Sequence, residues 1–232
     1  MTALIDADSI VYIVAWHHKE EEDTISGVYS VKAASDQLVQ SILDYSKAST
    51  YIGSFSDSTN FRYRHYLFAP YKGNRRKKDE WVCKWEPYIK DHLADKWGFV
   101  TCPDLEADDV ISGLWHLMQP NDNLVICSPD KDLLQIPGLH YDYKKNTGIV
   151  HIEEQVAQLK LCHQMLTGDR TDNIKGIPAI GEVKASALVP HHYSIEEMKT
   201  AVCHCYYKYF GEYYGPIIYE QTKIALQTLC LS

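Results

Sequence analysis

The chain has 232 residues, enough for one large domain or for a domain with an appended lobe. Hydrophobic residues at 45% and charged residues at 23% are typical of a globular protein and exclude a disordered or fibrous chain. No apolar run approaches a membrane span and no basic-then-apolar leader begins the chain, so we expect a cytoplasmic protein, in the host cytoplasm if it is viral. The seven cysteines are scattered without a CxxC pair, which argues against a disulfide framework or a zinc knuckle.

Charge is distributed unevenly along the chain, and its location matters more than the net value of −8. The acidic total argues by itself against a protein that binds phosphates. However, carboxylates that hold divalent cations are neutralised locally, and a basic patch can lie elsewhere. The segment 71–78 supplies such a patch, with cations at Lys72, Arg75, Arg76, Lys77 and Lys78.

Short apolar runs alternate with helical patterns up to Asp132. The predicted strands are Ala3–Ile5, Tyr51–Asp57, Phe99–Cys102 and Asn123–Ser128. The predicted helices are Val11–Trp16, Val31–Ala48, Trp81–Trp97 and a run that begins near Asp109. This alternation predicts an α/β fold with a central, mainly parallel sheet flanked by helices. Gly138–Tyr143 and Gly148–Ile152 add a predicted hairpin.

Acidic residues recur where the predicted strands end. Asp6 follows the first strand, Asp57 ends the second, and the fourth delivers Asp130 and Asp132. In open α/β sheets, ligands bind at the carboxyl ends of parallel strands, which meet at one edge. We therefore expect these carboxylates to converge.

A further acidic cluster precedes an amphipathic helical run. Glu106, Asp108 and Asp109 fall within four positions. Carboxylates at a helix N-terminus are favoured by the helix dipole, so capping alone is one explanation. The other explanation is that they join the strand-end acids in one site, and the recurrence of acids at strand ends favours it.

Beyond Glu153 the pattern becomes helical. One predicted helix stops at Gly168 and is followed by two more acids, Asp169 and Asp172. Further helices are predicted over residues 194–210 and 219–231.

A glycine-flanked turn lies between Asp172 and the next short helix. Its candidate contacts to nucleic acid are Gly176, Ile177, Gly181 and Lys184. Glycines let the chain approach a phosphate backbone closely, and amides at the following helix N-terminus face a phosphate. We therefore predict a helix-turn-helix DNA-binding element at about residues 165–190.

The candidate metal ligands are carboxylates from several segments of the chain. They are Asp6, Asp57, Glu106, Asp108, Asp109, Asp130, Asp132, Asp169 and Asp172. So many acids cannot share one pocket as bare anions, because neighbouring like charges raise each other's pKa. Hard divalent cations resolve this conflict, and oxygen ligands select Mg²⁺ or Mn²⁺ over zinc. The alternative is that these acids are scattered surface caps.

Four ordered motifs resemble those of the flap endonuclease and 5′–3′ exonuclease family, most closely the bacteriophage-type 5′ exonucleases, with their PIN-like nuclease fold. The motifs are Tyr71–Arg75, Glu106–Asp109, Pro129–Leu134 and Gly168–Gly181. The resemblance covers nearly everything from Ile5 to about Val189. It implies a nuclease core over residues 1–152, with a short arch region at about 72–100, and a C-terminal helix-hairpin DNA-binding lobe over 153–232.

The resemblance also implies an activity. The chain would be a Mg²⁺-dependent, structure-specific nuclease that cuts DNA at a 5′ end, flap, nick or gap during replication or repair. Two metal ions about 3.5–4 Å apart would activate water and stabilise the leaving oxygen. RNA in an RNA–DNA hybrid would be a further substrate, Mn²⁺ would substitute for Mg²⁺, and we expect a monomer.

Residue roles follow from the matched motifs. The catalytic residues would be Lys72, Asp6, Asp108 and Asp130. The metal nearer the reacting phosphate would be held by Asp6, Asp57, Glu106, Asp108 and Asp109, and the second metal by Asp130, Asp132, Asp169 and Asp172. Lys72 would stabilise charge on the scissile phosphate, assisted by Arg75 or Arg76, while Lys77 and Lys78 would contact other phosphates. The turn from Gly176 to Gly181 would bind duplex DNA and a potassium ion.

Two features depart from the family pattern. Its usual opening is Asp-Gly, whereas Ala7 and then Asp8 follow Asp6. Asp8 is either an outer-shell metal ligand or a helix cap, and we favour the cap. The segment 78–102 is short for a helical arch that threads a free 5′ end. A partly open arch would suit attack on a duplex or gapped end as well as flap removal.

Two other functions are alternatives. The acids at 6 and 8 after a strand resemble the nucleophile and acid pair of a haloacid-dehalogenase-type phosphatase. That enzyme would have no use for the cluster at Glu106–Asp109 or for the glycine turn. The second alternative is a nuclease-like fold that only binds DNA, against which the full set of acids argues.

Overall fold

The computed structural model describes residues 1–119 and 123–228. Its main sheet has six strands in the order β3-β2-β1-β4-β5-β6, and all neighbours are parallel except β5 and β6. The strands are β1 (Thr2–Asp6), β2 (Thr50–Phe55), β3 (Val100–Thr101), β4 (Leu124–Cys127), β5 (Gly138–Tyr141) and β6 (Ile149–Ile152). The predicted α/β fold with a mainly parallel sheet is confirmed, as is the hairpin of β5 and β6.

The centre of the sheet explains the apolar runs in the sequence. β1 and β4 are neighbours, and Leu4, Ile5, Val125 and Ile126 are buried within them, as expected for parallel strands covered on both faces. The chain crosses from β1 to β2 on one side and later reaches β4 on the other. The carboxyl ends of β1 and β4 therefore form a topological switch point, where ligands bind in open α/β sheets.

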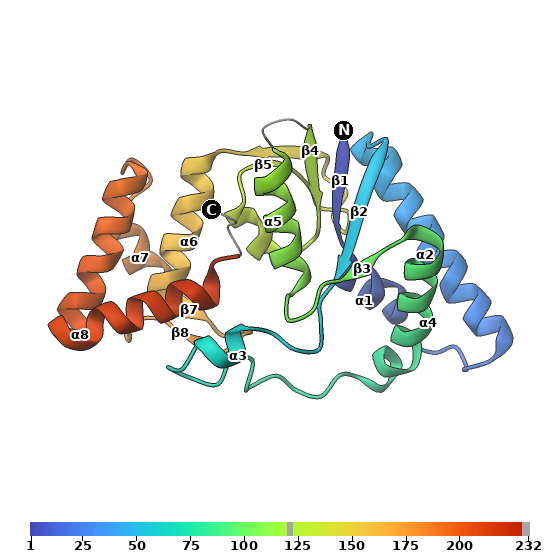
Figure 1. Cartoon of the computed structure of the whole chain (residues 1–232), viewed down its shortest axis with the longest axis horizontal. Helices are drawn as coiled ribbons and strands as arrows, with labels where there is room; N and C mark the ends of the chain where they lie inside the picture. Colours follow the sequence, from blue (N-terminus) through green and yellow to red (C-terminus); the bar gives the residue numbers. More distant parts are fainter. Residues whose placement is uncertain (120–122, 229–232) are drawn as a thin grey trace.

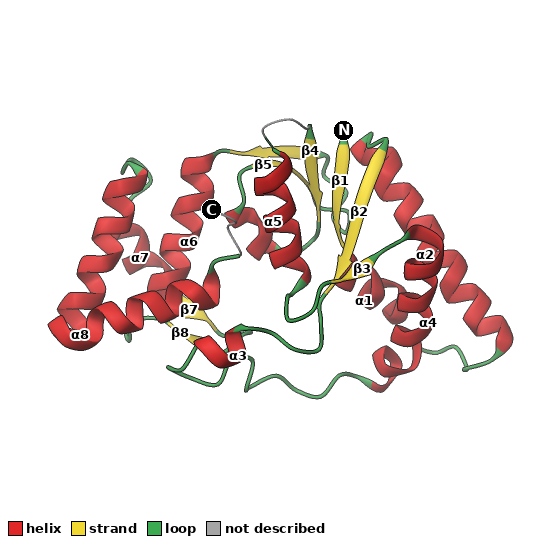
Figure 2. Cartoon of the chain, viewed as in Figure 1, coloured by secondary structure: helices red, strands yellow, loops and turns green. Residues whose placement is uncertain are grey.

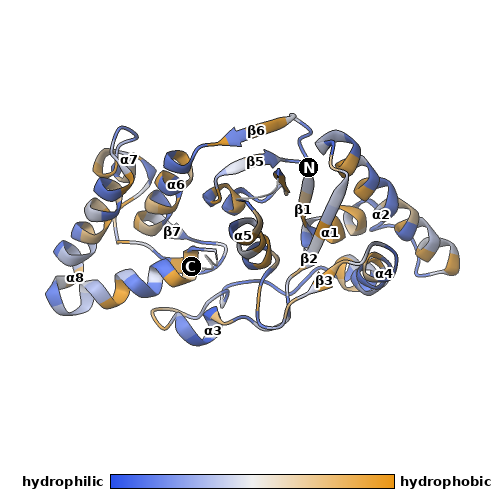
Figure 3. Cartoon of the chain, turned by 45° about the horizontal axis from the view of Figure 1, so that its top comes forward, coloured by the Kyte–Doolittle hydropathy of each residue, from blue (hydrophilic) through white to orange (hydrophobic). Residues whose placement is uncertain are grey.

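Helices cover both faces of the sheet (Figures 1 and 2). One face is covered by α1 (Ala7–His17), α2 (Ile25–Ser46) and α4 (Glu80–Trp97), and the other by α5 (Ala107–Met118) and the 3-10 turn η1 (Lys131–Gln135). Apolar residues of α4, including Trp85, Ile89 and Leu93, are buried in the core that α4 shares with α1, α2 and the sheet. The helices carry apolar and polar residues on different sides, as amphipathic packing requires (Figure 3).

The predicted arch region divides into two parts. Residues 72–79 contain no helix or strand and follow the short helix α3 (Arg62–His65). The remainder is α4, which packs on α1 and α2 and so belongs to the body of the molecule. Only the loop preceding α4 is therefore placed to serve as an arch.

The C-terminal region has its own core, centred on Met165, Leu166 and Val202. Its elements are α6 (Glu154–Thr167), β7 (Gly168–Asp169), β8 (Ile174–Lys175), α7 (Glu182–Leu188) and α8 (Ile195–Leu226). The predicted helix-turn-helix thus contains a two-stranded ribbon between its helices.

The last helices differ from the prediction. Gly211, at φ 81°, interrupts α8, and the second segment begins directly after it rather than at Tyr219. The predicted end at Leu231 lies outside the described residues. No helix in the described ranges is both long and apolar enough to cross a membrane.

Candidate metal and nucleic-acid site

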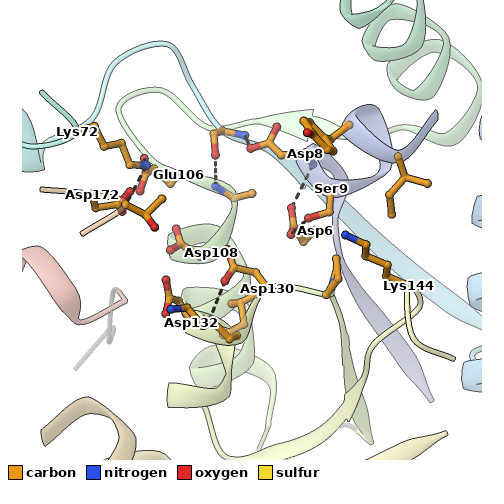
Figure 4. A pocket seen from close by; sticks show the side chains of 18 of the residues that line it. Asp6, Asp8, Ser9, Lys72, Glu106, Asp108, Asp130, Asp132, Lys144 and Asp172 are labelled. Carbon is orange, nitrogen blue, oxygen red and sulfur yellow. Dashed lines mark hydrogen bonds and ion pairs between the residues drawn. The ribbon is translucent and has the colours of Figure 1, made fainter. Parts of the chain in front are cut away.

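A pocket of about 470 Å³ opens at the carboxyl ends of β1 and β4 (Figure 4). Eight of the predicted site residues line it, namely Asp6, Lys72, Arg75, Glu106, Asp108, Asp130, Asp132 and Asp172. They come from five separate segments, so the convergence expected from strand-end acids is found in the structure.

Asp6 lies at the centre of this edge, at the end of β1. Its carboxylate caps α1 by accepting a hydrogen bond from the backbone N–H of Asp8 at 3.1 Å, and it accepts others from Ser9 and Ser128, each at 2.8 Å. Burial, reinforced by the Asp8 carboxylate, raises the pKa of Asp6 to about 6. Such a group gains by binding a cation, which stabilises its charged form.

The cluster at the start of α5 combines capping with a buried ion pair. Glu106 and Asp109 form a reciprocal capping box, as the helix-cap interpretation required. Arg62 is buried and donates to both carboxylate oxygens of Asp109, at 2.5 and 2.7 Å. Arg62 also donates to the backbone carbonyl of Ala225 at 3.0 Å, which ties the end of α8 to the site.

On the Lys72 side of the pocket, lysine and arginine side chains neutralise the carboxylates. Lys72 forms an ion pair with Glu106, and Arg75 pairs with Asp172 at 2.7 Å. The Tyr71 hydroxyl lies 2.8 Å from the Glu106 carboxylate and 3.1 Å from that of Asp172. Burial and these two carboxylates hold the pKa of Tyr71 well above its usual value, so it remains a hydrogen-bond donor.

A second, smaller cavity of about 20 Å³ lies behind the pocket and is close to the size of one water molecule. Four carboxylate residues are in its lining, namely Asp108, Asp132, Asp169 and Asp172. Burial raises the pKa of Asp132 to about 6, with added repulsion from Asp130 and Asp169. Burial and the Asp109 carboxylate likewise raise the pKa of Asp108.

Asp57 lies outside this pocket, although it ends the predicted strand. Its carboxylate accepts hydrogen bonds from the backbone of Ser58 and Asp104, at 2.7 and 2.8 Å, and from the Thr59 hydroxyl at 2.7 Å. Led by the bond from Asp104, these donors lower the pKa of Asp57 to about 2. The pocket is lined at this point by Ser56 instead.

Two pocket residues were missed or misread in the sequence. Asp8 does not cap the helix, because Asp6 is the N-cap of α1. Instead, Asp8 lines the pocket and accepts a bond from the backbone N–H of Ser56 at 3.1 Å. Lys144, in the turn between β5 and β6, also lines the pocket. The only signal for Lys144 in the sequence was its place in the hairpin turn after β5, the strand that neighbours β4.

The remaining basic residues of the loop do not line the pocket. Arg76 and Lys77 are exposed. Lys78 forms an ion pair with Glu86 of α4 at 2.6 Å.

The glycine turn lies beside a second groove. This groove shares Lys131, Asp132 and Thr171 with the pocket, so the two are continuous, and Gly181 is in its lining. Gly176 packs so closely on the preceding helix that a methyl group there would come within 2.3 Å of the backbone of Thr167. Ile177 is buried beneath the turn.

Lys184 stabilises the glycine turn by a hydrogen bond to its backbone. Its amino group donates to the backbone carbonyl of Ala179 at 2.8 Å. Ala179 adopts a left-handed conformation, with φ 62°, where a glycine would be unstrained.

The donor chemistry of the pocket fits hard divalent cations. Ligand atoms of Glu106, Asp108 and Asp109 lie within 4.8 Å of one another. The acids around the pocket and the small cavity offer carboxylate oxygens, which suit Mg²⁺, Mn²⁺ or Ca²⁺ rather than soft metals. The raised pKa values of Asp6, Asp108 and Asp132 reflect burial and repulsion between carboxylates, and a bound cation would relieve both.

Comparisons with known proteins identify relatives of this chain. The 34% identical 5′-3′ exonuclease of Buchnera aphidicola (subsp. Acyrthosiphon pisum) matches over 156 residues, which is 61% of this chain and 53% of the relative. The flap endonuclease Xni of Shewanella amazonensis is 29% identical over 151 residues, 61% of this chain and 60% of the relative. The chain thus spans about half the length of the curated 5′-3′ exonucleases it matches.

Solved structures share the fold. The bacteriophage T5 D15 protein, co-crystallised with metal ions, has a TM-score of 0.73 at 16% identity and covers 97% of this chain and 89% of its own. A complex of the T5 flap endonuclease with DNA and metal ions gives the same TM-score at 15% identity, covering 97% and 88%. The family model for the 5′-3′ exonuclease N-terminal resolvase-like domain matches residues 1–163. The chain therefore belongs to the 5′-3′ exonuclease family.

Proposed function

We propose that this chain is a Mg²⁺-dependent, structure-specific 5′ nuclease that hydrolyses DNA phosphodiesters. The observation that carries the proposal is a pocket in which carboxylates from four segments face Lys72 and Arg75 from a fifth. Oxygen ligands for divalent cations and fixed cations for a phosphate are the two requirements of metal-assisted phosphodiester hydrolysis. Family membership argues against the haloacid-dehalogenase alternative.

The ligand set that we propose has two parts. Asp6, Glu106, Asp108 and Asp109 would hold the ion nearer the scissile phosphate, with Asp109 also anchored by Arg62. Asp130, Asp132, Asp169 and Asp172 would hold the second ion. When bound, Mg²⁺ or Mn²⁺ supplies an activated water and neutralises charge that develops on the phosphate.

Lys72 and Arg75 would bind the reacting phosphate. Both side chains are held near the pocket by carboxylates, Lys72 by Glu106 and Arg75 by Asp172. A phosphate entering the pocket would compete for these cations, and hydrogen bonds to its oxygens would strengthen as negative charge develops. Tyr71 would keep Glu106 and Asp172 oriented during this exchange.

The DNA would extend from the pocket along the continuous groove to the glycine turn. The backbone at Gly176, Ile177 and Gly181 would approach the duplex, with Lys184 stabilising the turn. A potassium ion at the turn carbonyls would have to share the Ala179 carbonyl with Lys184. Arg76 and Lys77 would contact phosphates outside the pocket.

The substrates we propose carry a 5′ end at a flap, nick or gap, with RNA in hybrids as a further class. The loop at 72–79, rather than a closed helical arch, would contact the single strand. We further propose that the protein acts as a monomer in the cytoplasm, of a host cell if viral, during DNA replication or repair.

Product sizing on labelled DNA tests the function. The 5′ flap, nicked, gapped and blunt substrates are incubated with Mg²⁺, alongside a generic phosphomonoester. We expect DNA cleavage near the 5′ end and no turnover of the phosphomonoester. Phosphomonoester turnover without DNA cleavage would support the phosphatase alternative, and tight flap binding without cleavage would support a DNA-binding role alone.

A further inference from the structure

Lys144 is a pocket cation that the proposed mechanism does not use. It lies in the turn between β5 and β6 and lines the pocket together with Asp6 and Asp130. Figure 4 shows its amino group directed toward these carboxylates from the side opposite Lys72. In the described part of the chain, no carboxylate forms an ion pair with Lys144.

The turn that carries Lys144 is held firmly against the metal-binding edge. Tyr143 is buried, and its hydroxyl donates to the backbone carbonyl of Asp6 at 2.7 Å. The Asp142 carboxylate accepts hydrogen bonds from the backbone N–H groups of Lys144 and Lys145, each at 3.0 Å. The backbone at Lys144 is therefore fixed relative to β1, and only its side chain has to order when a ligand binds.

Lys145, the next residue, has different surroundings. Its amino group pairs with Asp142 at 2.9 Å, and its side chain is 72% exposed. Lys145 therefore balances the carboxylate that shapes the turn. Since this carboxylate already has a partner, the turn does not need Lys144 for its own stability, and Lys144 is available to a ligand.

We propose that Lys144 binds a backbone phosphate of the cleaved DNA strand, beside the phosphate that is hydrolysed. This rests on the proposed function, because it takes DNA as the ligand of the pocket. Lys72 and Lys144 approach the carboxylates from opposite sides, so each suits a different phosphate (Figure 4). With the acids neutralised by divalent cations, the Lys144 ammonium becomes a point-charge donor to phosphate oxygen.

The consequence is a fixed register for the substrate strand. Phosphate contacts position a nucleic acid without reading its sequence. Lys72 would contact the scissile phosphate and Lys144 the phosphate beside it, so the strand would be held at two points. Lys144 is thus assigned as a positioning residue for the phosphodiester, not as a donor to the reacting phosphate.

The salt dependence of DNA binding tests this assignment. A fluorescent 5′ flap duplex is titrated by anisotropy with Ca²⁺ in place of Mg²⁺, since Ca²⁺ accepts the same oxygen ligands in looser geometry. Lys144→Ala should reduce the slope of log affinity against log salt by about 0.7–0.9, the value for one lost phosphate contact. Lys144→Arg should restore the slope, and the matched control Lys145→Ala should keep the wild-type slope.

A neutral linkage locates the contact. A single methylphosphonate, placed in turn at each phosphate around the cut, should weaken wild-type binding at one flanking position and leave Lys144→Ala unaffected there. An unchanged salt slope in Lys144→Ala, or identical methylphosphonate profiles for the two proteins, would overturn the proposal. Failure of the wild-type protein to cleave DNA with Mg²⁺ is a separate result, and it would overturn the proposed function instead.

Discussion

The two sides of the carboxylate pocket contain similar side chains but balance their charges differently. On the Lys72 side, Glu106 and Asp172 each pair with a lysine or an arginine. Among the remaining acids, here called the unpaired side, Asp6 and Asp132 form no ion pair within the described residues, and burial raises the pKa of each to about 6.

This difference indicates which side needs cations from solution. Where fixed cations already balance the acids, further positive charge brings little gain. Where buried acids have no ion pair, a divalent cation offsets both the desolvation penalty and the mutual repulsion. The unpaired acids thus have the greater need of metal ions, while Lys72 and Arg75 on the paired side are placed to meet the reacting phosphate.

The largest expected effect comes from removing an acid of the unpaired side. Asp130→Ala should reduce cleavage by about 10³-fold or more, because the second metal ion loses a ligand and stabilises the charge at the reacting phosphate less well. DNA binding should be largely retained, since Asp130 is exposed and belongs to none of the ion pairs formed among the described residues. Cleavage rates and binding by anisotropy check this, and equal loss of both would mean that the acid is structural.

Asp57→Ala is the informative comparison for this experiment. Its carboxylate accepts hydrogen bonds from Thr59 and Asp104 and lies outside the pocket, so cleavage should fall far less than in Asp130→Ala. A loss as large as that of Asp130→Ala would return Asp57 to the ligand set.

The next largest effect is a loss of stability when the buried ion pair between Arg62 and Asp109 is broken. Arg62→Ala leaves the Asp109 carboxylate buried without its bidentate partner and should lower the free energy of unfolding by about 3–5 kcal/mol. Arg64→Ala is a matched control on the same short helix. Its ion pair with Asp104 is exposed, so a loss below about 1 kcal/mol is expected in denaturant titrations. Equal losses would contradict the role of Arg62.

Removing the lysine of the paired side should affect the rate of cleavage more than the affinity for DNA. Lys72→Ala should slow the single-turnover rate by about 10²–10³-fold, with a much smaller change in affinity for DNA. Lys77→Ala, an exposed cation of the same loop, should weaken binding slightly and leave the single-turnover rate unchanged. A wild-type rate in Lys72→Ala would contradict the assigned role.

The smallest expected effect is a pH dependence of stability. Asp6 and Asp132 have folded-state pKa values raised to about 6, so the stability they contribute is complete below about pH 4 and is lost as pH rises through 6. With a chelator present, the melting temperature should therefore fall between pH 5 and pH 7. Mg²⁺ should raise it more at pH 7 than at pH 5, and a pH-independent Mg²⁺ shift would contradict the charge imbalance.

The convergence of the acids was predictable because it follows from the type of fold. Apolar runs that alternate with helices specify a parallel sheet, and the carboxyl ends of its strands must meet. Asp6, Asp130 and Asp132 were placed together by this rule alone. Helix capping by the cluster at Glu106 and Asp109 was also predicted as one of its two explanations, since it depends on neighbouring residues.

Side-chain direction at the strand ends was not predictable. Successive residues of a strand face opposite sides, so a difference of one position decides whether Ser56 or Asp57 faces the pocket. Asp8 was misread for a related reason, because Asp6 already supplies the helix cap. Nothing local in the sequence distinguishes these cases.

The sequence by itself determined the sheet, its order of helices and strands, and the edge at which the acids meet, because hydrophobic period and chain connectivity are local properties. Only the tertiary structure decided which charges are balanced. Arg62 and Asp109 pair across 47 positions, and Lys144 faces the pocket while Lys145 turns to Asp142. These outcomes depend on burial and on distances between segments, and the division of the pocket into two sides follows from them.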